Sequence, residues 1–180
     1  MSLQTQAILM LEHRGEVLAT ARRVSAILRD AKINGAIICG IAVFLHGYER
    51  TTTDVDVFVG GPLEAASNAM KRAGLKYNSA NREFRWGKVP VQLVDEKIVQ
   101  PVPIDRMQID EVTTVSLADL INMKLRSGSN NLARSQDIAE VVGLIRANKL
   151  TGAFTSKLEK SMRAEFRKLA KAVQNDPPQN

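Results

Sequence analysis

The chain has 180 residues and an apolar share of 44%, which fits one domain, or one domain with an appendage, and excludes an intrinsically disordered protein. Its formal net charge of +6 favours polyanionic partners such as nucleic acid or nucleoside phosphates, although the same excess of positive charge also serves solubility. The aromatic residues, at 4%, show no aromatic–basic pattern of the kind that forms a stacking platform for single-stranded nucleic acid.

The first part of the chain alternates apolar runs with amphipathic stretches, and turn residues such as Asn34-Gly35 separate them. The predicted elements are, in chain order, a helix over 16–30, a strand over 36–39, a short helix over 41–47, a strand over 54–59, a helix over 63–74, a hairpin of strands over 82–87 and 88–95, a loop over 98–110 and a strand over 111–115. His46, on the short helix, is predicted to be a structural histidine.

The pattern changes at residue 116. Ser116 and Asp119 resemble a capping box and predict a helix over 117–128. A loop over 127–131 and a helix over 132–149 follow, and apolar residues at helical spacing from Phe154 onwards predict a last amphipathic helix. We therefore predict an α/β core of the α+β type over residues 1–115, with a mixed sheet flanked by helices, and a C-terminal helical segment over 116–180.

The cysteine and hydropathy patterns predict a cytoplasmic protein without membrane contact. The single cysteine, Cys39, excludes an internal disulfide and suits a reducing compartment. We predict that Cys39 is a small buried apolar side chain and has no redox role. The longest nearly unbroken apolar run, residues 35–45, falls short of the about 18 residues that span a bilayer. No signal-peptide pattern opens the sequence.

The strand over 54–59 carries two carboxylates on one face. Side chains alternate along a strand, so Asp54 and Asp56 share a face with Phe58, while the valines between them line the other. Two carboxylates so placed repel each other, and a shared divalent cation such as Mg²⁺ removes that repulsion. The alternative is the solvated face of an amphipathic strand.

The residues around this strand resemble the nucleotidyltransferase superfamily. Its signature is a glycine–glycine or glycine–serine turn followed by Asp-x-Asp on the next strand, and the corresponding stretch here is "CGIAVFLHGYERTTTDVDV". The stretches "SLADLINMKL" and "ARSQDIAEVVGLI" resemble the helical half of small bacterial nucleotidyltransferase-like proteins, including toxin components of abortive-infection systems. The resemblance covers about residues 34–148, and it implies transfer of a nucleoside monophosphate from a nucleoside triphosphate to an acceptor hydroxyl.

Carried over by position, the resemblance makes Asp54 and Asp56 the catalytic ligands of Mg²⁺ or Mn²⁺, and Gly40 part of the turn that receives the triphosphate. Cys39 stands where the family has the first turn glycine. The third carboxylate of active members is replaced by Gln92, and Asp95, three residues further on, is the remaining candidate for that role. Strand alternation puts Asp95 on the face opposite Gln92.

Further nucleotide-binding candidates are Arg50, Thr53, Lys124, Arg134 and Asp137. For Arg50 the alternative is a surface ion pair, and for Arg134 with Asp137 it is an ion pair that joins the helical segment to the core.

The sequence is compatible with two hypotheses on the function of the chain. The chain is a metal-dependent nucleotidyltransferase with an RNA, protein or small-molecule acceptor, or it is a catalytically inactive binding module with a partner protein, as in a toxin–antitoxin pair. A purely nucleic-acid-binding role, for which the basic last helix is a candidate surface, rests on charge alone.

Overall fold

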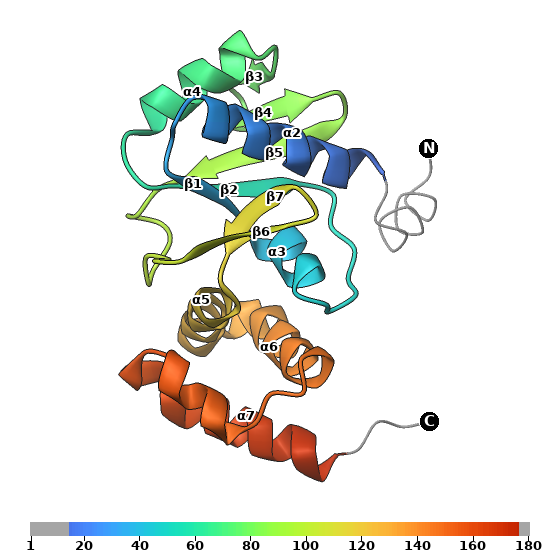
Figure 1. Cartoon of the computed structure of the whole chain (residues 1–180), viewed down its shortest axis with the longest axis vertical. Helices are drawn as coiled ribbons and strands as arrows, with labels where there is room; N and C mark the ends of the chain where they lie inside the picture. Colours follow the sequence, from blue (N-terminus) through green and yellow to red (C-terminus); the bar gives the residue numbers. More distant parts are fainter. Residues whose placement is uncertain (1–14, 177–180) are drawn as a thin grey trace.

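A computed structural model describes residues 15–176, and its centre is a seven-stranded mixed sheet with helices on both faces (Figure 1). The strands lie in the order β3-β4-β5-β2-β1-β7-β6. Their bounds are Gly35–Ile38 for β1, Val55–Val59 for β2, Lys76–Asn78 for β3, Glu83–Trp86 for β4, Val89–Val94 for β5, Arg106–Ile109 for β6 and Val112–Val115 for β7. This arrangement confirms the predicted α/β class with a mixed sheet.

The central strand is β2, which runs antiparallel to β1 and parallel to β5. Its valines, Val55, Val57 and Val59, face one side of the sheet and its Phe58 faces the other, as strand alternation predicts. Because both faces of β2 are covered, its apolar residues are almost completely buried.

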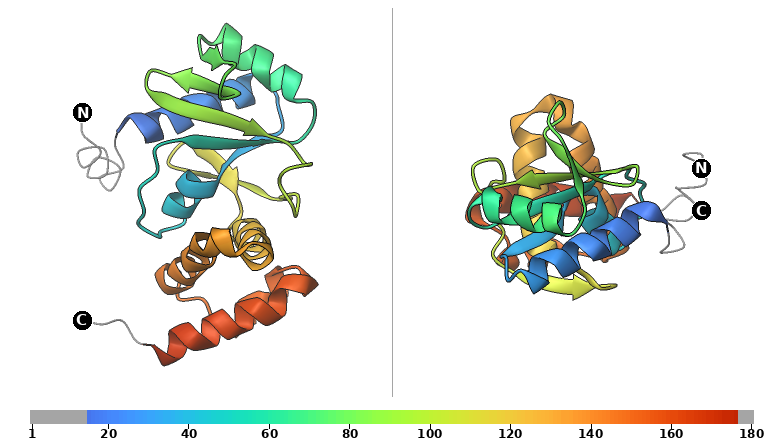
Figure 2. Two further views of the ribbon diagram at one scale, coloured as in Figure 1. Left: turned by 180° about the vertical axis from the view of Figure 1, so that it is seen from behind. Right: turned by 90° about the horizontal axis from the view of Figure 1, so that it is seen from above.

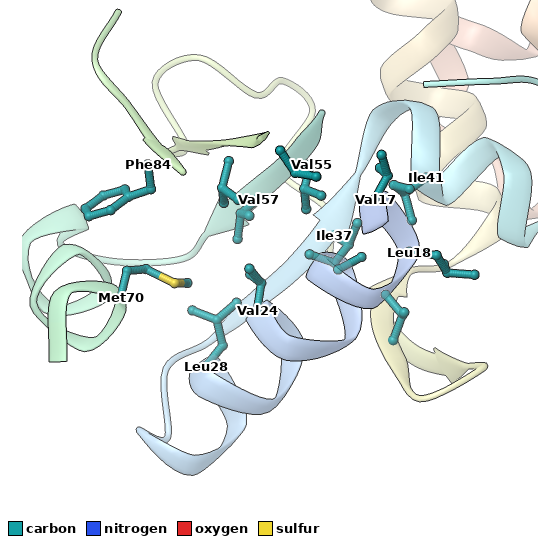
Figure 3. Close-up of a cluster of buried hydrophobic side chains, with 14 of the residues drawn as sticks. Val17, Leu18, Val24, Leu28, Ile37, Ile41, Val55, Val57, Met70 and Phe84 are labelled. Atoms are coloured by element: carbon teal, nitrogen blue, oxygen red, sulfur yellow. The ribbon is translucent and has the colours of Figure 1, made fainter. Parts of the chain in front are cut away.

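One face of the sheet is covered by α2 (Glu16–Asp30) and α4 (Leu63–Arg72). Figure 3 shows Val24 and Leu28 of α2 facing Ile37 and Val57 of the sheet, and all four side chains are buried. At about 1.5–3 kcal/mol for each fully buried large aliphatic side chain, this layer supplies a large part of the folding free energy.

The opposite face is covered by α5 (Leu117–Asn130) and α6 (Ser135–Ala147), and α7 (Arg163–Asn175) packs against α6. The short helix α3 (Cys39–Leu45) contributes side chains to the cores on both faces. Figure 2 shows the C-terminal helices stacked below the sheet, with α7 furthest from it. Leu120, Leu144 and Phe166 are buried in this second core. Whether the helices form a domain of their own, with the boundary at residue 116, stays a prediction.

Three predicted segments differ from the structure. The predicted loop over 127–131 is wrong, because α5 continues to Asn130. A Cβ atom on Gly128 would lie 2.6 Å from the Ile138 side chain of α6, so the small residue lets the two helices approach, and this packing outweighs the low helix propensity of the segment. The predicted loop over 98–110 contains β6, and β3 has no counterpart in the prediction.

The predicted last helix begins late. Residues Gly152–Lys157 and Lys160–Met162 form 3-10 turns, and the α-helix starts only at Arg163. A buried side chain of α5 explains the interruption, because the side-chain oxygen of Asn122, Oδ1, accepts a hydrogen bond from the backbone N–H of Glu159 at 3.1 Å. Within residues 15–176, no helix combines the length and the apolar character needed to cross a bilayer.

His46 is a buried structural residue, as predicted. Its Nε2 atom lies 2.9 Å from the carbonyl oxygen of Val115, so the neutral ring donates a hydrogen bond to β7. Burial lowers the pKa of His46 below its ordinary value of 6.5. The imidazole of His46 therefore binds a proton more readily in the unfolded chain than in the folded protein. The stability that the buried, neutral His46 contributes is lost as the pH falls below the pKa of His46 in the unfolded chain.

We predict that the difference in free energy of unfolding between the wild type and His46→Gln depends on pH. Urea unfolding will show the advantage of the wild type above about pH 6.5 and its progressive loss below that value. A constant difference between the two proteins across this range would contradict the assignment of a buried, neutral histidine.

Candidate functional site

A cavity of about 530 Å³ lies between the sheet and helices α5 and α6. On the sheet side, the cavity is bounded by the three strands β1, β2 and β5. Their register places Ile38 of β1, Asp56 of β2 and Gln92 of β5 side by side in one row across the sheet. All three residues line the cavity. The side chains of Met123 and Lys124, from α5, line the opposite wall.

The cavity contains both predicted metal ligands. Asp54 immediately precedes β2 and Asp56 lies within it, and each is only partly exposed. The Thr52 hydroxyl donates a hydrogen bond to Asp54 Oδ1 at 2.7 Å, which orients this carboxylate. Burial, with a further contribution from the negative charge of Asp54, raises the pKa of Asp56 above its ordinary value. The negative charge of Asp54 thus opposes the ionisation of Asp56.

Cys39 lies at the position where the family signature has a glycine, and its backbone explains that preference. Its φ of 55° is in the left-handed region, which glycine adopts without steric cost and other residues adopt at a cost of about 1–2 kcal/mol. Burial, assisted by the charge of Asp56, raises the pKa of the Cys39 thiol far above its ordinary value. A protonated thiol is a weak nucleophile, which agrees with the predicted packing role.

Gly40 follows in the first turn of α3, but it does not line the cavity. A Cβ atom there would lie 2.7 Å from Thr52 Oγ1 and 2.8 Å from Thr52 Cβ. The absence of a side chain at Gly40 therefore leaves space for the Thr52 side chain, whose hydroxyl donates the hydrogen bond to Asp54. Thr53, the predicted contact, is exposed and outside the cavity, and nothing in the run of three threonines distinguishes Thr52 in sequence.

Gln92 occupies the position expected of a third carboxylate. It pairs in register with Asp56 and lines the same cavity, so a neutral amide faces the two aspartates. Asp95 lies beyond the end of β5 and does not line the cavity. Its Oδ1 accepts a hydrogen bond from the backbone N–H of Lys97 at 3.0 Å, which makes it a turn residue.

A buried ion-pair network adjoins the cavity and contains most of the other candidates. Lys124 Nζ lies 2.6 Å from Asp137 Oδ1 and 2.7 Å from Glu140 Oε2. The Glu140 carboxylate also pairs with Arg50, and Asp137 lies 3.8 Å from Arg134. Burial by itself would lower the pKa of Lys124, but its interactions with Cys39, Asp137 and Glu140 together outweigh burial, and the pKa is raised.

The network separates the candidates into two groups. Arg50 and Lys124 are both held by Glu140. Glu140 is not among the predicted residues, although its spacing of three residues from Asp137 places both acids on one helix face. Both Lys124 and Arg134 line the cavity, but Arg134 keeps 63% of its side chain exposed and Lys124 only 10%. Arg134 is therefore the basic candidate best placed to meet a ligand.

The donor set suits a hard divalent cation. Among the described residues, no group of three or more His, Cys, Asp or Glu side chains is arranged to hold a metal ion. Mg²⁺, however, needs only one or two carboxylates when substrate phosphates complete its octahedron. Asp54 and Asp56 supply two carboxylates, and the amide oxygen of Gln92 is a neutral oxygen donor on the same face.

Solved structures share this fold. A nucleotidyltransferase-like antigenic protein from Paracoccidioides brasiliensis matches with a TM-score of 0.55 and 17% identity over 88% of each chain. The crystal structure of ANT(2")-Ia in complex with adenylyl-2"-tobramycin matches with a TM-score of 0.56 and 13% identity, over 83% of this chain and 96% of that one.

The solution structure of the antibiotic-resistance factor ANT(2'')-Ia gives a TM-score of 0.53 over 96% of both chains, again at 13% identity. No protein-family model matches the sequence, and no curated protein matches it. The three-dimensional likeness confirms the nucleotidyltransferase resemblance at the level of the fold.

We predict that Asp54→Asn stabilises the metal-free protein at neutral pH. The substitution keeps an acceptor for the Thr52 hydroxyl and removes the charge that opposes ionisation of Asp56, so the free energy of unfolding rises by up to about 1 kcal/mol. Urea unfolding in the presence of a chelator measures the effect. Asp95→Asn, a turn residue outside the cavity, is the matched control and should be neutral. An unchanged or lower stability of Asp54→Asn would contradict the electrostatic coupling.

A second prediction concerns Glu140. Glu140→Gln leaves Lys124 and Arg50 without their shared carboxylate in a buried place, so it should cost about 3 kcal/mol of stability. Glu165→Gln, which removes only a partly exposed pair with Lys168, should cost less than about 1 kcal/mol. Equal losses in the two variants would show that the buried network does not stabilise the helical layer.

Proposed function

We propose that this chain, which has the nucleotidyltransferase fold, transfers a nucleoside monophosphate from a nucleoside triphosphate to an acceptor hydroxyl and releases pyrophosphate. The observation that carries the proposal is the pair Asp54 and Asp56 in one cavity, where burial and their mutual repulsion raise the pKa of Asp56. A bound Mg²⁺ or Mn²⁺ would supply charge neutralisation for the phosphates at these two carboxylates.

The size and charge of the cavity support a nucleotide as the ligand. Its volume of about 530 Å³ is in the range of about 300–1,000 Å³ that small-molecule sites have. The charged residues that line it are Asp54, Asp56 and Asp137 against Lys124, Arg126 and Arg134, so their formal charges balance. A triphosphate brings about four negative charges, which is why binding should depend on divalent cations.

The residues then have distinct roles. Asp54 and Asp56 hold the metal, and Arg126 and Arg134 are placed at the cavity to contact phosphates. Lys124, with Asp137 and Glu140 as partners, contributes positive potential near Asp56 and keeps α5 and α6 in position. Chemistry of this type depends mainly on positioning and on electrostatic stabilisation of the transferred group.

We consider three classes of acceptor for this chemistry. The ANT(2")-Ia structure contains an adenylylated tobramycin, so a small-molecule acceptor is one option for a chain of this fold, beside RNA or a protein. A cytoplasmic location and a bacterial toxin–antitoxin context stay predictions.

A second candidate function is a catalytically inactive binding module with a partner protein, as in a toxin–antitoxin pair. Gln92 favours it, because a neutral amide stands in register with Asp56 at the position of the third carboxylate. An amide cannot accept a proton from an acceptor hydroxyl, so any transfer by the wild type should be slow.

We predict that one nucleoside triphosphate stabilises the wild type only in the presence of Mg²⁺ or Mn²⁺. At a ligand concentration a hundred times the dissociation constant, the gain is about 2.7 kcal/mol, which is visible as a rise in the thermal midpoint. Asp56→Asn should abolish the metal-dependent rise, and Asp95→Asn should keep it. If no triphosphate stabilises the wild type, the proposed activity is wrong and the inactive binding module becomes the better account.

Gln92→Asp distinguishes the two candidates further. If the cavity binds metal and nucleotide, restoring a carboxylate in register with Asp56 should raise pyrophosphate release by about a hundredfold, the range of a positioned general base. Gln108→Asp, on the exposed face of β6, is the matched control. Unchanged pyrophosphate release in a folded, nucleotide-binding Gln92→Asp variant would favour the inactive module.

A further inference from the structure

The positive charge of the chain is concentrated in one short stretch. Residues 71–88 contain the six basic residues Lys71, Arg72, Lys76, Arg82, Arg85 and Lys88, and one acidic residue, Glu83. This stretch therefore carries a formal charge of +5, out of +6 for the whole chain. It forms the end of α4 and the strands β3 and β4, at the edge of the sheet furthest from α7 (Figure 1).

The structure places a hollow of about 510 Å³ at this edge. Lys76 and Arg85, which are neighbours across β3 and β4, line it together with Tyr77 and Trp86. No acidic side chain of the described residues lines the hollow, and Glu83, which is buried, pairs with Arg85 at 2.6 Å. The hollow is thus basic, and its rim carries exposed aromatic rings.

The two rings are unusual in being both exposed and held in place. Tyr77 is 49% exposed and Trp86 is 36% exposed. The Arg23 guanidinium lies 3.7 Å from the centre of the Trp86 ring and is fixed by a hydrogen bond from its Nη2 to the Ala73 carbonyl oxygen. Tyr77 rests against Phe84, with 5.0 Å between ring centres. Ordered rings lose little conformational freedom when a flat ligand stacks on them.

We propose that this edge of the sheet is a binding site for single-stranded nucleic acid. Bases stack on the rings of Tyr77 and Trp86, and phosphates pair with Lys76, Arg85 and the exposed Lys71. Stacking tolerates any base because every base has a flat π-face, so the site binds strands with little sequence preference.

The charge and the strand length favour this ligand over two others. A second copy of the chain would bring two basic edges together, and the like charges would repel. A peptide that extended the sheet would pair with β3, which has only three residues. The polyanion alone complements both the charge and the aromatic rings.

The site is independent of the proposed nucleotidyl transfer. The cavity and the hollow share no lining residue. Trp86 pairs with Val89 on the sheet face of α2 and α4, and Arg85, which pairs with Pro90, is on the face of Gln92 but does not line the cavity. Binding of a strand at the β3–β4 edge requires neither a metal at Asp54 and Asp56 nor catalysis.

The chain offers a direct probe, because Trp86 is its one tryptophan. We expect an oligouridylate of about 12 nucleotides, added without divalent metal, to quench the fluorescence of Trp86 at low salt. Tyr77→Leu should weaken binding about tenfold by loss of one stacking ring. Lys76→Gln should reduce the slope of log K against log salt by about one.

The matched control is Lys168→Gln, an exposed lysine on α7 at the other end of the molecule, which should leave affinity and salt slope unchanged. Inorganic polyphosphate of similar charge tests the contribution of the bases and should bind more weakly than the oligonucleotide. Lys76 is an exposed residue, so Lys76→Gln still tests the proposal if Tyr77→Leu fails to fold.

Four results would overturn the proposal. The first is that the oligonucleotide does not bind at low salt, and the second is that a labelled strand binds by anisotropy without any change in Trp86 fluorescence. The third is that the affinities of Lys76→Gln and of the wild type depend equally on salt. The fourth is that polyphosphate binds as tightly as the oligonucleotide. Concentration-dependent shielding of Trp86 in the free protein would instead identify a second copy of the chain as the occupant.

Discussion

The rest of the structure depends on the pairing of β2 between β1 and β5. The valines of β2 are buried under α2 and α4, so the register cannot shift by one residue without moving them to the opposite face. The same register brings Ile38, Asp56 and Gln92 into one row. The hydrophobic effect on one face of the strand thus determines which polar groups meet on the other.

The helical layer depends on a different interaction, the buried network around Glu140. This carboxylate joins Arg50, in the segment before β2, to Lys124 on α5, and Asp137 shares the same lysine. Buried charges are tolerated only when they are paired, so the network requires α5, α6 and the segment before β2 to keep their positions together. The cavity at their junction is therefore formed by the core and the helices jointly.

Charge is distributed very unevenly over the molecule. The residues that line the cavity balance three carboxylates against three basic groups, whereas the stretch over 71–88 carries nearly all of the net charge. A balanced cavity suits a ligand that arrives with its own cations, and an unbalanced basic edge suits a polyanion that releases its counterions on binding. The two regions share no lining residue, and the basic stretch lies at the β3–β4 edge of the sheet, away from the row of Ile38, Asp56 and Gln92.

By itself, the sequence determined the α/β class, most helices and strands, the two faces of β2 and the pairing of Asp54 with Asp56. These features follow from periodicity and from alternation along a strand, which are local properties. The charge excess of residues 71–88 is also visible in the sequence, but Tyr77 and Trp86 are nine residues apart and meet only through the pairing of β3 with β4.

Tertiary structure alone decided the rest. The continuation of α5 past Gly128, the interruption before α7, the contact of Thr52 with Gly40 and the role of Glu140 all depend on partners distant in sequence. Local propensity is worth less than about 1 kcal/mol per residue, whereas losing a packed side chain or one partner of a buried ion pair costs about 3 kcal/mol or more, so the distant contacts prevail where the two conflict.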